Sequence, residues 1–325
     1  MTAAPGCKTP GPSAPRPRPP KPREADAIQA VWEASAAHDD PASWPRGGWS
    51  VTAWATDSRV LEVADRLVGV AAVRAEPDEA GVIYVRLALA PQARQTALAE
   101  ALVGAAVELT RSAGAHRARL WLPDRATWAI DAARLAGFAS VRGVAHMLLP
   151  ADAPTPSAAP VPGLRIRSIA LGEEADVLAA LNRAWAGTWG FVPIPLGMLE
   201  EDLAGQREGM LLGSLDPAPA IIATCHAVYE PAEQNPDGQP RAWISNLTVD
   251  PAYRQRGIAR AMLVQGISFL RARGAASVTL GVDAGDPAPL RLYLSAGFAI
   301  VSRQEAWEID LHTDTDTTTD RETPG

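Results

Sequence analysis

Cysteine, lysine and long apolar runs are scarce in this sequence. The two cysteines are Cys7 and Cys225. Because Cys7 lies in a proline-rich leader, a structural disulfide is not expected and a reducing compartment fits. No apolar run approaches the roughly 20 residues of a membrane-spanning helix, and the amino terminus lacks the apolar stretch of a secretory signal. We therefore expect a soluble, cytoplasmic protein without a membrane partner.

The positive charge comes almost entirely from arginine, since lysine occurs only at Lys8 and Lys21. Alanine, proline and arginine are abundant, so we interpret the shortage of lysine as a coding bias. The formal net charge of −7 argues against a nucleic-acid partner. The basic run from Arg16 to Arg23 is interleaved with prolines, and we interpret it as a solvated tail in preference to a contact for an acidic partner. No metal cofactor is expected.

Composition divides the 325 residues into folded and unfolded parts. Residues 1–22 are rich in proline, glycine and arginine, and residues 312–325 are mostly threonine and aspartate. Both are expected to be disordered because they contain too few apolar residues to bury. Residues 150–163 predict a Pro/Ala linker. Two folded segments remain, 23–149 and 164–311, which is the domain number that the length suggests.

The two folded segments resemble each other at a constant spacing. Pro251 matches Pro91 at a distance of 160 positions (251 − 91 = 160). The same spacing gives these matches: Arg254 with Arg94, Gln255 with Gln95, Ala259 with Ala99, Gly274 with Gly114, and Gly297-Phe298 with Gly137-Phe138. Chance similarity between alanine-rich helices is the alternative. A gap-free spacing over roughly 50 residues favours an internal duplication.

Strands and helices alternate in the second segment. Apolar residues at Ala259, Leu263, Ile267 and Leu270 share one helix face, and Gly274 is a typical helix end. The expected strands are 164–169, 210–215, 221–229, 243–249, 277–282, 299–303 and 306–311, and the expected helices are 173–185, 258–273 and 289–295. This order predicts an α/β fold with a mixed sheet.

A loop between strand and helix is the most informative stretch of the sequence. It consists of Arg254, Gln255, Arg256, Gly257, Ile258 and Ala259. The start of a helix exposes unpaired backbone N–H groups and partial positive charge, which suits a pyrophosphate. Gly257 allows close approach of the backbone, and Ala259 keeps the first turn narrow. Arg254 and Arg256 add charge that can neutralise phosphate.

This loop resembles the acetyl-CoA loop of the GNAT acetyltransferase superfamily, whose pattern is Gln/Arg-x-x-Gly-x-Gly/Ala. A second element, Leu292 to Phe298, resembles the family's short helix with a Leu-Tyr pair before Gly-Phe. The resemblance implies an α/β fold of two tandem GNAT-like lobes. Tandem lobes are similar to the mycothiol synthase group, which acetylates a cysteinyl amine on an inositol glycan, although segment lengths and the tail differ.

The resemblance also implies an activity, namely transfer of an acetyl group from acetyl-CoA, as co-substrate, to a primary amine. The strand 246–249 should splay from the strand 277–282, and the pantetheine arm should pair with the backbone of Leu247 and Val249. The amine attacks the thioester directly. Tyr293 is then placed to protonate the leaving thiolate. The alternative for Tyr293 is a core aromatic residue.

Two departures from the family pattern concern polar positions. Asp286 stands where the family often has asparagine, and Pro289 where it often has alanine. Asp286 can still cap the short helix next to the cofactor. Asn246 stands where many relatives place a glutamate, so the general base is open: His226, Glu230, a water relay, or an amine that is already deprotonated.

Aromatic residues follow the first helix of the second segment. Trp185, Trp189 and Phe191 occupy the region that covers the acceptor site in GNAT proteins, so we expect them to bind the acceptor. The alternative is that they anchor the core. The acceptor is expected to be a small-molecule or peptide amine.

The first segment lacks the residues that chemistry would use. Ala97, Thr96 and Ala133 stand where the second segment has its loop glycine, an arginine and the tyrosine. The leading strand that begins at Leu164 has no convincing counterpart before Glu24. We therefore expect a degenerate lobe. The competing interpretation is a non-catalytic protein in which both lobes serve as an acyl-CoA sensor or scaffold.

Overall fold

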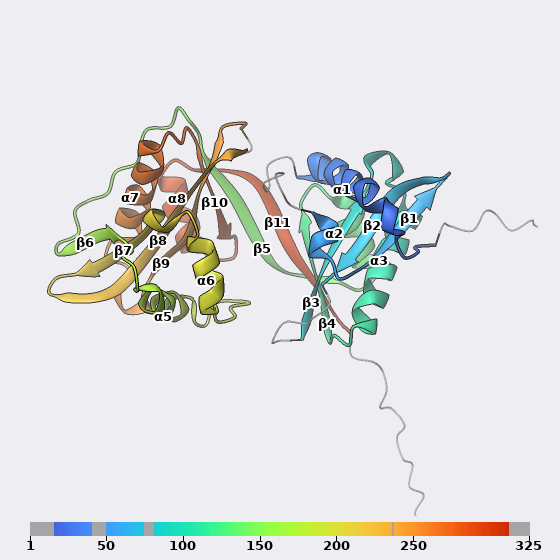
Figure 1. Ribbon diagram of the computed structural model, residues 1–325, viewed down its shortest axis with the longest axis horizontal. Coiled ribbons are helices and arrows are strands. Elements are labelled where there is room, and N and C mark those ends of the chain that lie inside the picture. Colours follow the sequence, from blue (N-terminus) through green and yellow to red (C-terminus); the bar gives the residue numbers. More distant parts are fainter. Residues whose placement is uncertain (1–15, 41–49, 75–80, 236, 312–325) are drawn as a thin grey trace, which may run out of the picture. The chain divides into compact units, whose positions relative to one another are not determined.

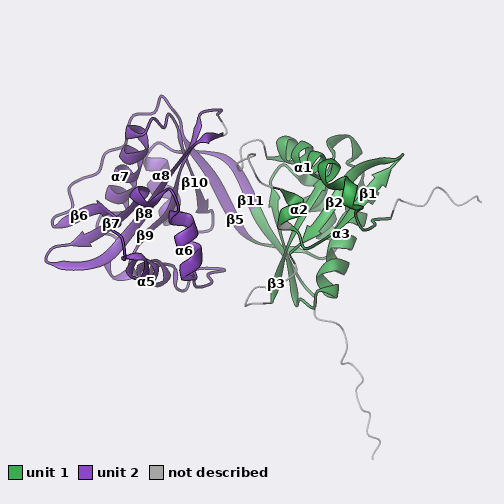
Figure 2. Cartoon of the chain, viewed as in Figure 1, with its two compact units in different colours: residues 1–40, 49–141, 305–325 green, residues 41–48, 142–304 purple. Residues whose placement is uncertain are grey.

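The computed structural model describes residues 16–40, 50–74, 81–235 and 237–311 (Figure 1). Two compact units are present. Unit 1 is formed by the described residues within 1–40, 49–141 and 305–325, and unit 2 by those within 142–304 (Figure 2). The expected disorder of residues 1–15 and 312–325 lies outside the described residues. None of the described helices is long and apolar enough to span a membrane.

Unit 1 is a sheet with helices on both faces. The strands β1 to β3 are antiparallel, and β4 is parallel to β3. The bounds are β1 (Asp57–Val63), β2 (Arg66–Val73), β3 (Val82–Leu89), β4 (Arg117–Pro123), α1 (Ala25–Asp39), α2 (Val51–Trp54), α3 (Thr96–Ser112) and α4 (Thr127–Leu135), with short 3-10 turns at Pro22–Glu24 and Pro91–Ala93. Side chains alternate between the two faces. Val70 and Ala72 therefore pack with α1 and α2, whereas Ala71 and Val73 pack with α3 and α4.

The strand order through unit 2 includes β5-β10-β9-β8-β7-β6. Of these neighbours, β9 and β10 are parallel and the others are antiparallel. The strands are β5 (Ala139–Leu149), β6 (Leu164–Ser168), β7 (Met210–Leu215), β8 (Ala218–Gln234), β9 (Pro240–Val249) and β10 (Val278–Asp283). The helices are α5 (Glu174–Trp185), α6 (Leu196–Leu203), α7 (Ile258–Ala272) and α8 (Pro287–Ser295), with 3-10 turns at Arg207–Gly209 and Pro251–Tyr253.

The two faces of the unit 2 sheet have separate cores. Leu211, Cys225 and Leu280 pack with α7 and α8. Met210 and Leu212, which alternate with Leu211, pack with α5 and α6. The face that carries α5 and α6 is called the α5/α6 face below.

Helix α7 has the expected apolar stripe and packs closely on the sheet. Ile258, Met262, Ile267 and Leu270 are buried at helical spacing. Gly266 also faces the sheet, and a Cβ there would lie 2.7 Å from the sulfur of Cys225. Gly274 follows the helix with φ +93°, a conformation that glycine adopts without steric cost.

The two final strands expected at 299–303 and 306–311 are wrong, because the structure contains one continuous strand, β11 (Ala299–Asp310). The sequence between Arg303 and Ala306 contains neither glycine nor proline, so nothing interrupts the extended chain. The last part of β11 belongs to unit 1. There Trp307 joins the core, and Leu311 donates a 2.8 Å hydrogen bond to the carbonyl of His116.

Strand β5 shows the reverse relation. Residues 142–149 follow the first repeat in sequence but belong to unit 2, where they pair with β10 from Val278 opposite Leu149 to Asp283 opposite Val144. The compact units therefore do not end at the segment boundaries expected from composition. Each expected segment contributes its last strand, or part of it, to the other unit.

The end of the leader is folded, which corrects the expected disorder for residues 16–22. The backbone of Arg18 forms an antiparallel bridge with Val60 through hydrogen bonds of 3.0 and 2.8 Å. Its guanidinium group contacts Glu24 and Glu62. A basic residue among prolines is thus paired with two carboxylates, and the bridge is a one-residue counterpart of β6, which pairs with β7 from Leu164 to Ser168.

Candidate functional site

The loop between β9 and α7 presents unused backbone donors. Gln255 and Gly257 have positive φ values of 64° and 79°, so the chain turns sharply before α7 begins at Ile258. In the described part of the chain, no hydrogen bond engages the backbone N–H groups of residues 255–260; the first helical bond is donated by Ala261 to the carbonyl of Gly257. Such a cluster of free donors at a helix start suits an anion.

The absence of a side chain at Gly257 keeps this loop open. Its φ is one that other residues rarely adopt, and a Cβ would lie 3.6 Å from a methyl group of Val161. Val161 is part of the expected linker, which lies against α7. Arg260 donates hydrogen bonds to the carbonyl of Ser157 at 2.7 Å and to the hydroxyl of Ser295 at 2.8 Å. The linker thus forms one wall beside the loop.

The two loop arginines have different surroundings. Arg254 donates to the carbonyl of Val249 at 3.1 Å and to that of Ala184 at 3.0 Å. Its guanidinium group therefore ties the end of β9 to the end of α5, and its expected contribution to neutralising phosphate stays a prediction. Arg256 is exposed and donates to the carbonyl of Ala252 at 3.2 Å.

Strands β9 and β10 separate as expected. They pair at a single position, Trp243 with Thr279, whereas β3 and β4 pair at four positions from Val82 to Val85. The remainder of β9 therefore has free backbone groups along the gap. Leu247 and Val249 lie in this part of β9 and pack toward α7.

A β-bulge interrupts β9 at the gap. Asn246 has φ +47°, and the register with β8 shifts between Thr224 and His226. The hydroxyl of Thr224 donates a 2.9 Å hydrogen bond to the carbonyl of Asn246. Bulges re-aim backbone groups and are frequent beside active sites.

Tyr293 lies in α8 and is 7% exposed. Burial raises the pKa of its phenol above the ordinary value, with a smaller contribution from Cys225. Cys225 lies on β8 between the two residues that flank the register shift, and it belongs to the same core as Tyr293. The phenol stays protonated at neutral pH and can donate a proton. Asp286 caps α8 as expected, accepting 2.9 Å from the N–H of Ala288.

The three aromatic candidates for acceptor binding differ in burial. Trp185 is half-buried against the core between α5, α6 and the sheet, which agrees with the alternative of a core anchor. Trp189 is 40% exposed, and Phe191 is half-buried. Both lie in the loop before α6, which Asn182 holds by accepting 3.0 Å from the N–H of Ile194.

The two candidate bases, His226 and Glu230, differ in their surroundings. His226 is 2% exposed, and burial lowers its pKa to about 4, opposed by a backbone hydrogen bond with Gln206. Glu230 is paired with Arg241 at 3.1 Å. Burial raises the pKa of Glu230, while Arg241 lowers it. Among the described residues no group of histidine, cysteine, aspartate and glutamate is arranged to hold a metal ion.

In the equivalent loop of unit 1, backbone N–H groups donate hydrogen bonds within the loop itself. Helix α3 begins at Thr96, and the N–H groups of Leu98 and Ala99 bind the carbonyl of Gln95 at 3.0 and 3.1 Å. The matching groups in unit 2, at Ile258 and Ala259, have no such bond. Unit 1 therefore lacks the cluster of free donors.

Side chains also close the unit 1 equivalent of the site. The indole N–H of Trp128 donates to Asp39 at 3.0 Å, and Arg94 pairs with the same carboxylate at 2.7 Å. Trp128 corresponds to Ala288 at the repeat spacing (288 − 128 = 160). These contacts link the ends of α1, α3 and α4, and Ala288 of unit 2 has no side chain that could make the contact of Trp128.

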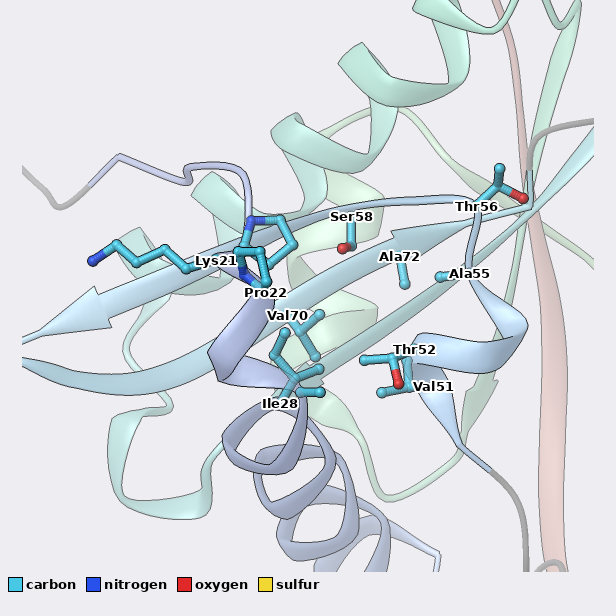
Figure 3. Close-up of a pocket in the computed structure, with 12 residues that line it drawn as sticks. Lys21, Pro22, Ile28, Val51, Thr52, Ala55, Thr56, Ser58, Val70 and Ala72 are labelled. Carbon is cyan, nitrogen blue, oxygen red and sulfur yellow. The ribbon is translucent and has the colours of Figure 1, made fainter.

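Unit 1 contains a separate pocket of about 320 Å³ between α1, α2 and the sheet (Figure 3). Its floor is apolar, formed by Ile28, Val51 and Val70, and the side chain of Lys21 extends away from them. The rim carries hydroxyl groups, including that of Ser58. This lining provides no acid–base pair or nucleophile with an activating partner.

Two residues near the unit 2 site escaped the sequence analysis. Arg260 is hidden among the arginines of α7, and only its contacts distinguish it. His146 belongs to the first segment in sequence, yet β5 carries it into unit 2 opposite Gly281. Its isolation between apolar neighbours was the available signal, but the strand pairing that gives it meaning is not visible in the sequence.

Comparisons with known proteins show what the chain is similar to. The model described as the acetyltransferase (GNAT) family matches residues 23–138 and 175–298. A mycothiol acetyltransferase of Propionibacterium freudenreichii subsp. shermanii is 29% identical over 290 residues, 86% of each chain. The mycothiol acetyltransferase of Acidothermus cellulolyticus is 31% identical over 264 residues, 77% of each chain.

Solved structures show the same fold. A GCN5-related N-acetyltransferase from Sphaerobacter thermophilus matches with a TM-score of 0.71 and 21% identity, covering 92% of this chain and 96% of that one. A tandem GNAT protein from the clavulanic acid biosynthesis pathway matches with a TM-score of 0.63 and 15% identity, covering 91% and 97%. Both expected features, the GNAT fold and its tandem arrangement, are confirmed.

Proposed function

Because the chain belongs to the acetyltransferase (GNAT) family, we propose that unit 2 transfers an acetyl group from acetyl-CoA to a primary amine. The observation that carries this proposal is the difference between the two repeats. Unit 2 has free N–H groups at residues 255–260 and an open gap beside β9. Unit 1 has engaged donors at Leu98 and Ala99, and a tryptophan at the equivalent of Ala288.

Each part of acetyl-CoA has a matching element in unit 2. The pyrophosphate would accept hydrogen bonds from the loop that contains Gly257. The pantetheine arm would pair with the backbone of β9 at Leu247 and Val249, as an added strand does. The thioester would then lie at the bulge formed by Asn246, close to Tyr293. Asp286 caps α8 at the side of this path.

The reaction needs one bond to form and one to break. The neutral amine attacks the thioester carbonyl, a C–N bond forms, and the C–S bond breaks. The sulfur leaves as a thiolate and takes the proton of Tyr293, which solvent restores. The surplus proton of the amine is lost to a base. A phenol is protonated at neutral pH, and burial raises the pKa of Tyr293 further, so the donor carries its proton before the attack.

The acceptor is proposed to be a small-molecule amine, which the names of the curated relatives support. The cysteinyl amine on an inositol glycan, which the mycothiol synthase group acetylates, is the first compound to assay. Trp189 and Phe191 are placed to cover it from the loop before α6. Trp185 supports that loop from the core.

Thiol release from acetyl-CoA tests the proposal. Purified protein is incubated with acetyl-CoA and a panel that contains the cysteinyl glycan amine, free cysteine, a polyamine and a peptide with a free amino terminus. Amine-dependent thiol release with formation of the N-acetyl product is expected for at least one compound. Binding of acetyl-CoA without turnover on any of them would favour the alternative of a sensor or scaffold.

A further inference from the structure

Two histidines flank the gap between β9 and β10 on one face of the sheet. Register connects Met210 to His226 and His226 to Ser245. On the far side of the gap, Gly281 lies opposite His146. Strands β9 and β10 pair at Trp243 and Thr279. Ser245 lies two residues beyond Trp243 in β9, and Gly281 lies two residues beyond Thr279 in β10. A single row therefore crosses the sheet from His226 to His146.

This row lies on the α5/α6 face. Met210 belongs to the core between α5, α6 and the sheet, and directly paired residues of antiparallel strands share a face. Met147 and Leu280, which alternate with His146 and Gly281, face the opposite core beneath α7 and α8. Tyr293 belongs to that opposite core as well. The row and the proposed acid thus approach the gap from two sides.

Each histidine is separated from the gap by one strand, but only His146 is separated from it by a residue without a side chain. The strand between it and the gap carries Gly281, which has no side chain, and a Cβ at Gly281 would lie 3.9 Å from Nδ1 of His146. The imidazole therefore lies beside the space over Gly281. His226 is separated from the gap by Ser245, and it is 2% exposed.

The nearby carboxylates of Asp283 and Glu230 already have partners. Asp283 faces the same side as Gly281, two residues farther along β10, and it accepts hydrogen bonds from Arg142 and from the N–H of Gly285. Glu230 is paired with Arg241, five residues along β9 from the bulge at Asn246. Neither carboxylate lies in the row that borders the gap.

We propose that His146 is the general base that takes the proton of the acceptor amine in unit 2. This inference rests on the proposed acetyltransferase function. One imidazole nitrogen accepts a proton from the ammonium group and passes it to solvent, and the neutral amine attacks the thioester from the α5/α6 face. The imidazole then accepts the second proton, which the amine nitrogen loses as the amide forms. The imidazolium then releases its proton to solvent, while Tyr293 protonates the thiolate from the other side. The base for one repeat is thus carried by a strand that follows the other repeat in sequence.

The experiment uses the full chain and the amine of the panel with the highest kcat/KM. His146→Ala should lower kcat/KM by about 10²-fold, as loss of a general base does, with the acetyl-CoA dissociation constant unchanged within twofold. Added imidazole should restore part of the turnover, because it can occupy the space left by the side chain. His146→Gln keeps a polar side chain of similar length and should be equally slow, without rescue. His226→Gln serves as the matched control and should retain turnover.

Turnover of His146→Ala at the wild-type rate would overturn this inference and leave the acetyltransferase function standing. Loss of turnover together with loss of acetyl-CoA binding in both His146 variants, or a loss that imidazole does not reverse, would make His146 a structural residue and equally overturn it. Absence of turnover in the wild-type protein would overturn the proposed function itself.

Discussion

Gly257 and Ala97 occupy equivalent positions in the two repeats. Their side chains differ by a single methyl group, but the backbone conformations at the two positions differ greatly. Gly257 adopts φ +79° and leaves the loop open, whereas Ala97 lies inside the first turn of α3. At the start of the helix in unit 1, backbone N–H groups therefore donate to a carbonyl of the same loop. At the scale of single residues, the position that a glycine occupies decides whether the backbone remains free to bind an anion.

Gly257→Asp should weaken acetyl-CoA binding at least tenfold, which corresponds to about 1.4 kcal/mol. The side chain would strain a left-handed residue and bring negative charge to the pyrophosphate. Isothermal titration calorimetry measures the effect. Ala97→Asp, at the equivalent position of unit 1, is the control and should leave the affinity unchanged. Equal affinities for both variants and the wild type would refute the location of the pyrophosphate.

Tyr293→Phe should lower kcat about 10²-fold while acetyl-CoA affinity changes little, because the ring remains and only the proton donor is lost. Since burial raises the pKa of this phenol, its protonated form should persist as pH rises to about 10. Steady-state kinetics between pH 6 and about 9.5 should therefore show no loss of kcat through Tyr293. A fall in affinity with kcat preserved would make it a packing residue.

At the scale of elements, the contact between α7 and β8 depends on a glycine inside a helix. A Cβ at Gly266 would lie 2.7 Å from the sulfur of Cys225 and 2.9 Å from a methyl group of Ile244. Unit 1 has Ala106 at the same repeat position (266 − 106 = 160). Helix α7 therefore packs on its sheet with a glycine at this position, whereas α3 accommodates an alanine there. Both helices carry the same apolar stripe.

Gly266→Ala should destabilise the protein, because overpacking costs about 1–3 kcal/mol and exceeds the gain in helix propensity. Gly104→Ala in α3 is the matched control. No atom lies within 4 Å of a Cβ there, so the substitution should stabilise by about 0.5–1 kcal/mol. Thermal denaturation should shift in opposite directions for the two variants. Shifts of the same sign would show that the close approach at Gly266 relaxes without cost.

The elements of unit 2 could be predicted where one strand or helix carries its own pattern. The stripe and terminal glycine of α7, the cap of α8 by Asp286 and the splay of β9 were all visible in the sequence or in its resemblance. The contacts of Arg254 and the position of His146 were not, because each depends on a partner that is distant in sequence. Arg254 finds the carbonyl of Ala184, and β5 finds β10. No local periodicity specifies such partners.

At the scale of the whole molecule, the two repeats of the duplication differ. One repeat has the elements of the proposed site, whereas the other has internal contacts at the equivalent positions. In unit 1, Trp128 pairs with Asp39 and two N–H groups bond to Gln95, at the equivalents of the positions proposed to bind acetyl-CoA in unit 2. We expect the first repeat to fold and to take no part in the chemistry.

The double variant Gly257→Asp with Tyr293→Phe should show no amine-dependent acetyl transfer, and wild-type protein should bind one acetyl-CoA per chain. Both follow if unit 1 lacks the cluster of free donors and has no acid at Ala133. Thiol-release assays and calorimetric stoichiometry measure the two quantities, with circular dichroism as the control for folding. Substantial turnover in the double variant, or two equivalents bound by the wild type, would identify unit 1 as a working site.

The strand β11 has a consequence for the order in which the protein is made. Unit 1 includes residues 305–310, which the ribosome adds only after all of unit 2. Until then β4 has no partner on the side where Arg117 later meets Asp310, and an unpaired strand edge invites association with other chains. The nascent protein therefore spends the synthesis of unit 2 with its earlier unit incomplete and with that strand edge exposed.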